Sequence, residues 1–376
     1  MTFFQDKEKE MLLLLEQLVN IDSGTSNKQG VDEVGAILQK KYEELDFTVD
    51  VRKELHHGNI LIVKHKEAVN PEIIIIAHMD TVFKKGTASK RPFTIKGDRA
   101  YGPGVIDMKA SHVTLLYAIK SLITENKSSF KNVQIILNSD EEIGTVISRK
   151  LIEEQAKGKK FALIMEPARK DGSLVSARRG GGRYTLHVKG KAAHSGLEPQ
   201  NGLSAIEELA HKIVKLHQLN DYANGINVNV GIIEGGEAVN TVAPSALAHV
   251  DARISRMDQI EYIDQKVREI CSTADVKGTT ITIEGGITRP PMVKNEQTIE
   301  LLEIVKEVGI ELGINITDVA TGGGSDASFT SALGVPTLDG FGPIGGYPHS
   351  VDEYLEITSL TERSLLLAKV IDRLSE

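Results

Sequence analysis

Apolar residues recur along the first part of the chain with two different spacings. Residues 7–19 and 31–46 carry them at the three- and four-residue intervals of an amphipathic helix. Helical spacing returns at about 110–124 and 144–157. Short continuous apolar runs, typical of strands buried on both faces, lie at 59–63, 73–77, 133–138 and 161–165. Buried strands that alternate with helices predict an α/β fold with a mostly parallel sheet flanked by helices.

The middle of the chain has a different order of elements. Strand-like and helical segments follow one another as β-α-β-β-α-β, at 183–190, 203–219, 227–235, 246–254, 257–274 and 279–285. This is the ferredoxin-like arrangement, and it is complete within about this length. We therefore predict that 179–288 is a self-contained domain. It would be inserted into a discontinuous first domain made of 1–178 and 289–376.

The composition is that of an ordinary globular protein with two domains. A chain of 376 residues with 40% hydrophobic and 26% charged residues can bury a sizeable core. Its formal net charge of -8 argues against nucleic acid or an anionic membrane as the partner. Cys271 is the single cysteine, which excludes an intrachain disulfide and fits a reducing cytoplasm. Because no apolar run approaches the roughly 20 residues of a membrane span, we expect a cytoplasmic protein.

Three of the four apolar strands run directly into acidic or histidine side chains. The residues at these strand ends are His78 with Asp80, Glu141 with Glu142, and Glu166. The carboxyl ends of parallel strands share one edge of the sheet, which is where ligands bind. Two glycine-containing turns each add a candidate, Asp107 in GPGVID and His349 in GYPHS.

Carboxylates that converge at one edge repel each other and partly protonate unless a cation lies among them. Two histidines with three carboxylates suit a pair of divalent ions that share a carboxylate, whereas structural zinc usually takes cysteine ligands. The adjacent Glu141 and Glu142 could supply one general base and one metal ligand. Taken singly, each residue is more often an ordinary turn or strand-end residue. Their joint occurrence predicts a metal-dependent hydrolase.

The motifs HMDTV, GPGVIDMK, DEEIGT, MEP and HSVDEY, in this order, closely resemble the M20 family of dinuclear zinc peptidases. The resemblance covers nearly the whole chain, and GTASKRPFTIKGDRAYGPGVIDMKAS is most similar to the glutamate carboxypeptidase branch. It implies a zinc-peptidase-like catalytic domain in which the inserted domain serves as lid and dimerisation domain. It also implies hydrolysis of an amide bond that releases a free amino acid.

Other branches of the family leave further activities open. They include succinyl-diaminopimelate desuccinylase, acetylornithine deacetylase, aminoacylase and peptidase T. An N-acyl amino acid deacylase or a small-peptide aminopeptidase is therefore an alternative to a carboxypeptidase. In each case the expected partners are a small peptide or N-acyl amino acid as substrate and a second copy of the chain.

The resemblance assigns the metal ligands position by position. His78 and Glu166 would bind one ion, Glu142 and His349 the other, and Asp107 would bridge the two. Zinc is the expected metal, with cobalt or manganese as substitutes.

The same resemblance assigns three catalytic roles. Glu141 would be the general base that moves a proton from water to the leaving amine. The Asp80 side chain would hydrogen-bond His78 and fix its tautomer. His194, in GKAAHSG, would reach the active site of a partner subunit and stabilise the oxyanion there.

Substrate contacts are also implied by the resemblance. Asn240 and Arg253 resemble a substrate-positioning pair, because the arginine fork suits a free carboxylate, and Arg289 is a weaker candidate. Gly323 and Gly324, in TGGGSDAS, would offer backbone N–H groups to an anion.

Other interpretations of these segments stay open. His194 and Arg253 could be ordinary exposed residues, and the basic stretch that includes Arg91 is interpreted as a solvated face. A non-catalytic dimeric binding protein could use the same fold, although its metal site would be expected to be broken. A kinase-like enzyme could use TGGGSDAS for phosphate, but the segment lacks the Gly-Lys-Ser/Thr ending of a P-loop.

Overall fold

The computed structural model describes residues 2–376, and the chain forms two compact units. The first unit comprises the chain up to Ala177, Lys294–Thr321 and Ser325–Glu376. The second comprises Arg178–Val293 and Gly322–Gly324. Thus 289–293 and the three glycines, which we had expected in the first domain, group with the second unit. Within the described residues, no helix has both the length and the apolarity to cross a membrane.

A six-stranded sheet forms the centre of the first unit. Its strands, in spatial order, are β1 (Phe47–Arg52), β2 (Ile60–His65), β6 (Val133–Asn138), β3 (Ile73–His78), β7 (Phe161–Ile164) and β14 (Thr337–Leu338). The last four are parallel, and β1 and β2 add an antiparallel edge. The predicted mostly parallel sheet is confirmed. β1 was not predicted, because buried and more exposed positions alternate along it and it lacks a continuous apolar run.

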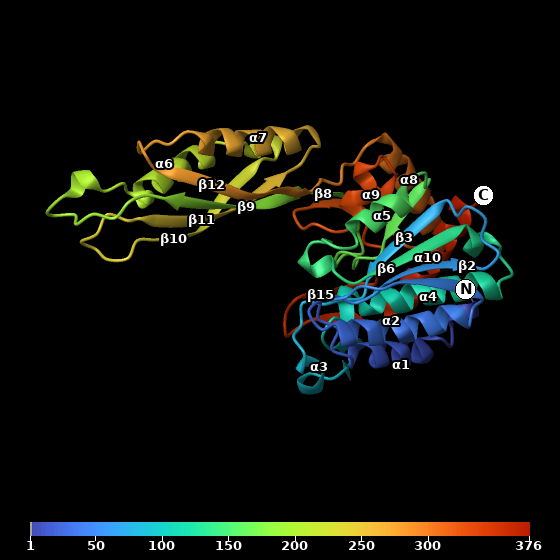
Figure 1. The fold of residues 1–376 in the computed structure, drawn as a ribbon. Helices are drawn as coiled ribbons and strands as arrows, with labels where there is room; N and C mark the ends of the chain where they lie inside the picture. Colours follow the sequence, from blue (N-terminus) through green and yellow to red (C-terminus); the bar gives the residue numbers. More distant parts are fainter. Residues whose placement is uncertain (1) are drawn as a thin grey trace. The chain divides into compact units, whose positions relative to one another are not determined.

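Helices cover both faces of this sheet. They are α1 (Glu8–Val19), α2 (Lys28–Glu43), α4 (Ala110–Thr124), α5 (Arg149–Ala156), α8 (Glu296–Leu312), α9 (Ala327–Ala332) and α10 (Thr358–Leu374). Figure 1 shows α2 and α4 on one side of β3, and α5 and α9 on the other. Side chains alternate across a strand, so Ile73 and Ile75 join the main core with α1, α2, α4, α8 and α10. Ile74 and Ile76 are equally buried on the opposite face.

The helix predicted at 144–157 begins later than expected, at Arg149. A single short turn, Glu141–Ile143, precedes it, and Gly144 and Thr145 both have positive φ angles. This left-handed backbone cannot continue a right-handed helix. The chain after β6 is therefore a loop where Glu141 and Glu142 lie.

A small antiparallel sheet joins two loops that carry candidate site residues. It consists of β15 (Gly345–Gly346), β16 (Tyr354–Glu356), β5 (Arg99–Tyr101) and β4 (Thr94–Lys96). The loop with Asp107 leaves the end of β5, and the loop with His349 connects β15 to β16. Pairing of β5 with β16 therefore brings these two loops to one place. A separate pair, β8 (Leu174–Arg178) and β13 (Asp318–Thr321), completes the strands outside the second unit's sheet.

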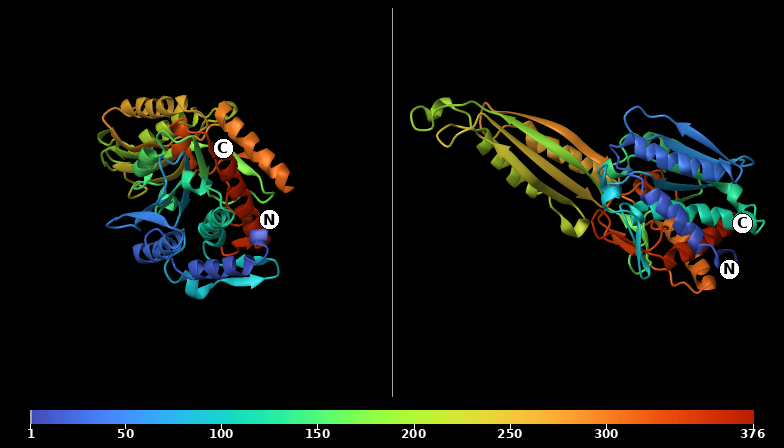
Figure 2. Two further views of the ribbon diagram at one scale, coloured as in Figure 1. Left: turned by 90° about the vertical axis from the view of Figure 1, so that its right-hand side faces the viewer. Right: turned by 90° about the horizontal axis from the view of Figure 1, so that it is seen from below.

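The second unit has the predicted order of elements. They are β9 (Gly180–Lys189), α6 (Ala205–His217), β10 (Asn227–Gly235), β11 (Ser245–Ile254), α7 (Asp258–Ser272) and β12 (Thr280–Arg289). The strands lie in the order β10-β11-β9-β12 and are all antiparallel. Figures 1 and 2 show both helices on one face of the sheet, and their apolar sides share a core with it. This is a ferredoxin-like arrangement.

A buried ion cluster ties α6 to the segment that follows α7. The side chains of Lys212 and Glu208 are fully buried, with Nζ 3.0 Å from Oε1. Lys212 Nζ also lies 2.6 Å from Asp275 Oδ2, and Glu208 accepts a hydrogen bond from the N–H of Val276 at 2.6 Å. Lys215, which is 44% exposed, pairs with the other oxygen of Asp275.

We expect Lys212→Met to lower the free energy of unfolding by about 3 kcal/mol or more, because it leaves the buried Glu208 charge without its cation. The matched variant Lys215→Met removes an exposed pair and should cost less than about 1 kcal/mol. Urea unfolding of the whole chain measures both. Equal losses in the two variants would contradict a special role for the buried pair.

Candidate metal centre

Asp107 lies between two histidines from distant parts of the chain. Its Oδ1 is 3.1 Å from Nε2 of His78, at the end of β3, and its Oδ2 is 3.1 Å from Nε2 of His349. One carboxylate therefore turns a different oxygen toward each imidazole. This is the arrangement that a carboxylate shared by two cations requires.

Two more carboxylates complete two groups of possible ligands. His78 Nε2 is 3.7 Å from Glu166 Oε1, just beyond β7, and His349 Nε2 is 3.2 Å from Glu142 Oε2. In each group, the candidate ligand atoms lie within 4.8 Å of one another. The groups share Asp107. The structure thus brings together the five residues that the sequence predicts as ligands, and their binding of metal stays a prediction.

The ring of His78 is oriented by its own loop. Nδ1 lies 2.9 Å from the backbone carbonyl of Asp80 and 3.5 Å from that residue's carboxylate. A carbonyl can only accept, so Nδ1 carries the proton and Nε2 faces Asp107 and Glu166. The carbonyl of His78 in turn accepts a hydrogen bond from His112 at 2.7 Å. We had expected the Asp80 side chain to be the main partner of His78, but the backbone oxygen is the nearer one.

The Asp80 carboxylate instead contacts the loop that carries the two adjacent glutamates. It accepts hydrogen bonds from the N–H groups of Glu141 and Glu142, at 3.2 and 3.3 Å. The hydroxyl of Thr25 donates to it at 2.6 Å. Asp80 is completely buried. It therefore connects the end of β3 to the loop after β6, a contact that the sequence analysis did not predict.

A second buried carboxylate, that of Asp326, also contacts the loop after β6. Asp326 accepts hydrogen bonds from the Thr145 hydroxyl at 2.6 Å and from the Asn138 amide at 2.8 Å. Thr145 has φ 59°, which is rare for a β-branched residue. Asp326 lies in the TGGGSDAS segment, where we had expected only substrate contacts from the glycines. The acidic residue in this segment was the available signal for a structural role.

Arg91 holds the loop that carries His349. Its guanidinium donates to the backbone carbonyls of Ser350 and Val351, at 3.3 and 2.9 Å. It also lies over the ring of Phe83, 4.8 Å from its centroid. The interpretation of the basic stretch as a solvated face is therefore wrong for Arg91. His349 itself has φ 63°, so its backbone needs external support.

Burial and neighbouring charges shift the pKa values of the side chains in this centre. Burial, with the nearby charge of Asp107, raises the pKa of Glu166 well above its usual value. Burial also raises the pKa of Glu142. Hydrogen bonds to Asp107 and Glu142 raise the pKa of His349 to about 10. Burial alone would lower the pKa of His78, but its hydrogen bonds to Asp107 and Asp80 outweigh this effect and raise it.

The residues present fit a pair of divalent cations. Imidazole nitrogens and carboxylate oxygens are a donor set that zinc accepts. Among residues 2–376, the buried Oε1 of Glu142 has no hydrogen-bond partner, so it could accept a cation. Cations would also remove the conflict that forces protons onto His349 and Glu166.

Two of the predicted residues of the second unit lie side by side. The N–H of Ser195 donates to the carbonyl of Asn240 at 2.9 Å, and His194 forms a bridge with Thr241. The His194 and Asn240 side chains are exposed. Arg253 is different, because its guanidinium makes a two-pronged pair with Asp251, at 2.8 and 3.0 Å. A substrate carboxylate would have to compete with that aspartate.

The other predicted residues of this unit form a second group. Gly324 packs against the side chain of Arg289: a Cβ at this glycine would lie 2.7 Å from Cδ of the arginine. The carbonyl of Gly323 accepts a hydrogen bond from Arg178 at 3.1 Å. Arg178 was not predicted. It is the first residue of the second unit, where no sequence motif marked it.

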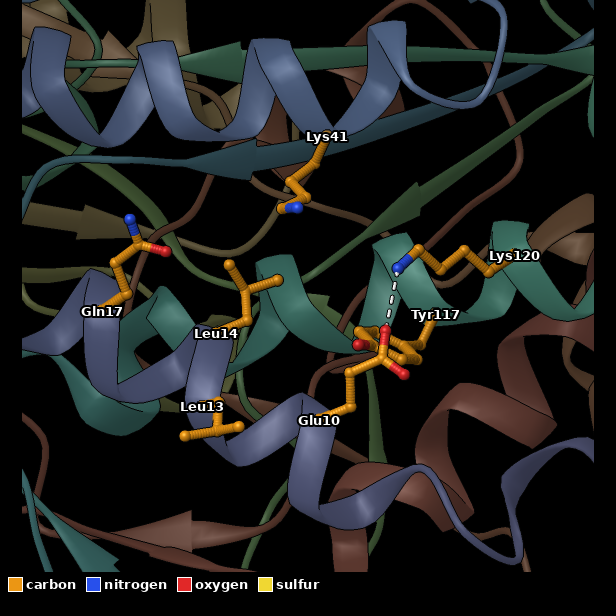
Figure 3. Close-up of a pocket in the computed structure, with 7 residues that line it drawn as sticks. All are labelled: Glu10, Leu13, Leu14, Gln17, Lys41, Tyr117 and Lys120. Carbon is orange, nitrogen blue, oxygen red and sulfur yellow. Dashed lines mark hydrogen bonds and ion pairs between the residues drawn. The ribbon is translucent and has the colours of Figure 1, made fainter.

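A separate hollow of about 200 Å³ lies among α1, α2 and α4. Figure 3 shows its lining of Glu10, Leu13, Leu14, Gln17, Lys41, Tyr117 and Lys120. None of these is a predicted site residue. In this hollow Lys120 pairs with Glu10 at 3.3 Å, and the metal-centre candidates lie elsewhere in the first unit.

Comparisons with known proteins give relatives in sequence and in fold. The model of peptidase family M20/M25/M40 matches residues 74–373. Carboxypeptidase G2 of Pseudomonas sp. (strain RS-16) is 29% identical over 374 residues, which cover 97% of this chain and 89% of the relative. Succinyl-diaminopimelate desuccinylase of Janthinobacterium sp. (strain Marseille) is 23% identical, with 92% and 94% covered. Aminopeptidase PepT of Bacillus cereus has a similar fold, with a TM-score of 0.82, 23% identity and 98% and 99% covered.

We expect binding of Zn²⁺ to release protons and to strengthen as the pH rises from about 6 to about 9. A pKa raised to about 10 means that His349 is protonated at neutral pH without metal, and the pKa of His78 is raised too. Only neutral imidazole binds a cation. Calorimetric titration in buffers of different ionisation enthalpy measures the protons released. The His349→Asn variant should release fewer protons on zinc binding than the wild type. An affinity that does not change with pH would contradict the assignment.

Proposed function

Because the chain belongs to peptidase family M20/M25/M40, we propose that it is a metal-dependent hydrolase with glutamate carboxypeptidase-like chemistry. It would cleave an amide bond and release a free amino acid. The observation that carries this proposal is the position of Asp107, with one oxygen at 3.1 Å from each of two histidines. A carboxylate shared in this way suits a pair of cations, which a hydrolase can use.

In this proposal each ion has two ligands of its own and shares the third. His78 and Glu166 hold one ion, His349 and Glu142 the other, and Asp107 lies between them. Zinc is the proposed metal, and cobalt or manganese could replace it. When bound, such a pair lowers the pKa of water and polarises the carbonyl that is cleaved.

Glu141 is the proposed general base. Its backbone is held by Asp80, and its carboxylate is close enough to contribute to the raised pKa of Glu166. It would take one proton from the attacking water and give it to the nitrogen of the leaving amine. The C–N bond breaks, the water oxygen stays on the acyl carbon, and the second proton of the water leaves the new carboxylic acid for the amine or the solvent, so the products are a carboxylate and an amine.

The relatives support more than one substrate class. The 29% identity to carboxypeptidase G2 favours a carboxypeptidase. The similarity to a desuccinylase keeps an N-acyl amino acid deacylase as the alternative. A small-peptide aminopeptidase is a third candidate activity, with the same hydrolytic chemistry. A non-catalytic binding protein would not need Glu141 beside a complete set of candidate ligands.

We propose that the second unit supplies substrate contacts. Asn240, Arg253 and Arg289 would position a substrate carboxylate, and the N–H groups of Gly323 and Gly324 would donate to it. Arg253 must first give up its pairing with Asp251. The substrate carboxylate would therefore compete with Asp251 for the guanidinium of Arg253.

We also propose a homodimer formed through the second unit. Two features support it: β10 is an edge strand, and it exposes Ile232 and Ile233, at 53% and 61%. Apolar edge strands pair readily with another chain. In such a dimer His194 would act in the active site of the partner subunit.

The proposed activity is tested with a panel of N-acyl-glutamates, acetyl-amino acids and tripeptides, with zinc, cobalt or manganese added. We expect hydrolysis of at least one class, fastest for substrates that release glutamate. Glu141→Gln should keep its metal and lose turnover by about 100-fold or more, since the base contributes about that much. Absence of turnover on every substrate, with two ions bound, would refute the proposal.

Subunit mixing tests the role of His194. His194→Ala and Glu141→Gln should each be nearly inactive alone, because one lacks the residue given to the partner and the other lacks its base. A co-expressed mixture should recover up to about a quarter of wild-type turnover, since half of random dimers then hold one intact site. A fully active monomer, or a mixture without recovery, would rule out action across the dimer.

A further inference from the structure

Glu353 is a buried carboxylate directly before β16 that contacts the loop carrying Asp107. It accepts three backbone hydrogen bonds: from Gly104 at 2.9 Å, from Ile106 at 2.9 Å and from Asp107 itself at 3.1 Å. Oε1 accepts the last two and Oε2 the first. The side chain is 1% exposed. A single carboxylate thus gathers most of the N–H groups of this short loop.

The loop has little freedom to satisfy these N–H groups in another way. Gly104 has φ 71°, and a Cβ at this position would lie 2.5 Å from the side chain of Thr81. The backbone of Asp107, at φ -115° and ψ 89°, and that of Met108, at φ -132° and ψ 39°, are not helical. Successive N–H groups that point to one side form a concave site for an anion. In this loop Glu353 fills that site.

Glu353 is costly to bury, which argues for a role beyond packing. Among residues 2–376, no lysine, arginine or histidine nitrogen lies within 4 Å of its carboxylate, so backbone N–H groups are its direct partners. The buried Lys109 is near enough for the charge of Glu353 to act on its pKa, but its Nζ donates to the carbonyl of Ile21. Burial of a carboxylate without a directly paired cation is among the more expensive arrangements in a protein interior. A neutral glutamine could accept at only one end, and its NH₂ would face an N–H donor at the other.

Glu353 also belongs to the chain segment that carries the second histidine. Three residues separate it from His349, and β16 pairs with β5, which leads into the loop of Asp107. The side chain therefore joins the segments that carry Asp107 and His349. A shift of Asp107 by a few tenths of an ångström would affect both groups of candidate ligands, because Asp107 belongs to both.

We propose that Glu353 is a positioning residue of the metal centre, which holds Asp107 where its two oxygens can face both ions. This inference rests on the proposed function, since it requires that Asp107 binds metal. Glu353 does not touch the ions or the substrate. It acts through the backbone of the loop, and outer residues of this kind affect metal affinity by about 10- to 100-fold.

The test compares the wild type, Glu353→Gln and the matched control Asp352→Asn in the full-length protein. Asp352 is the exposed neighbour of Glu353, and its substitution removes the same charge from the same loop. Zinc affinity and stoichiometry are measured by calorimetric titration. The visible spectrum of the cobalt-loaded protein reports ligand geometry, and the melting temperature without metal reports folding.

We expect Glu353→Gln to bind both ions about 10- to 100-fold more weakly than the wild type, with an altered cobalt spectrum. Asp352→Asn should match the wild type in both. Wild-type affinity and spectrum in Glu353→Gln would overturn the inference, even if that variant melts at a lower temperature. If Glu353→Gln does not fold, Glu353→Asp replaces it: its shorter carboxylate cannot reach Gly104 and Asp107 together, and unchanged affinity would overturn the inference as well.

Failure of the proposed function gives a different result. A wild-type protein that does not bind two ions would refute the metal centre itself, and the inference with it. A wild-type protein that binds two ions, with Glu353→Gln behaving identically, would refute only the role of Glu353.

Discussion

The structure depends on one electrostatic constraint: carboxylates and imidazoles from five separate places in the sequence meet at one end of a buried sheet. Without a cation such groups can coexist only by sharing protons, which is what the raised pKa values of His349 and Glu166 express. The fold nevertheless holds them in place. Rigid strands, and loops fixed by hydrogen bonds, hold these carboxylates and imidazoles in positions that electrostatic forces alone would change. This arrangement supports the proposal that a ligand of positive charge binds there.

Three further carboxylates hold the loops of this centre. Asp80 binds the N–H groups of Glu141 and Glu142, Asp326 binds the side chain of Thr145, and Glu353 binds the turn before Asp107. All three are almost completely buried. The acidic residues therefore form two layers. The inner layer consists of the candidate ligands Asp107, Glu142 and Glu166, and the outer layer, Asp80, Asp326 and Glu353, accepts hydrogen bonds from the loops. Because the outer layer already uses its oxygens on donors, it does not compete with the inner one for a cation.

The sequence was informative where a residue follows a buried strand. His78, Glu142 and Glu166 could be predicted together because three apolar runs had to end at the same edge of a parallel sheet. The contacts of Asp80, Arg91 and Glu353 could not, since they join loops whose paths depend on tertiary structure. The start of the helix after β6 was placed too early, because a left-handed Thr145 leaves no mark in an apolar pattern. The pairing of Arg253 with Asp251 was accessible, since residues two apart on a strand share a face.

The two proposed ion positions differ in their contact with solvent. The side chain of His349 is 53% exposed, whereas those of His78, Glu142 and Glu166 are 2%, 6% and 13% exposed. Ligand exchange begins where a competing molecule can approach, so a chelator would remove the ion beside His349 before the one beside His78. Partial removal of metal would then yield molecules that keep only the cation beside His78. In a cell short of metal, the position beside His349 would determine what fraction of this protein holds both ions.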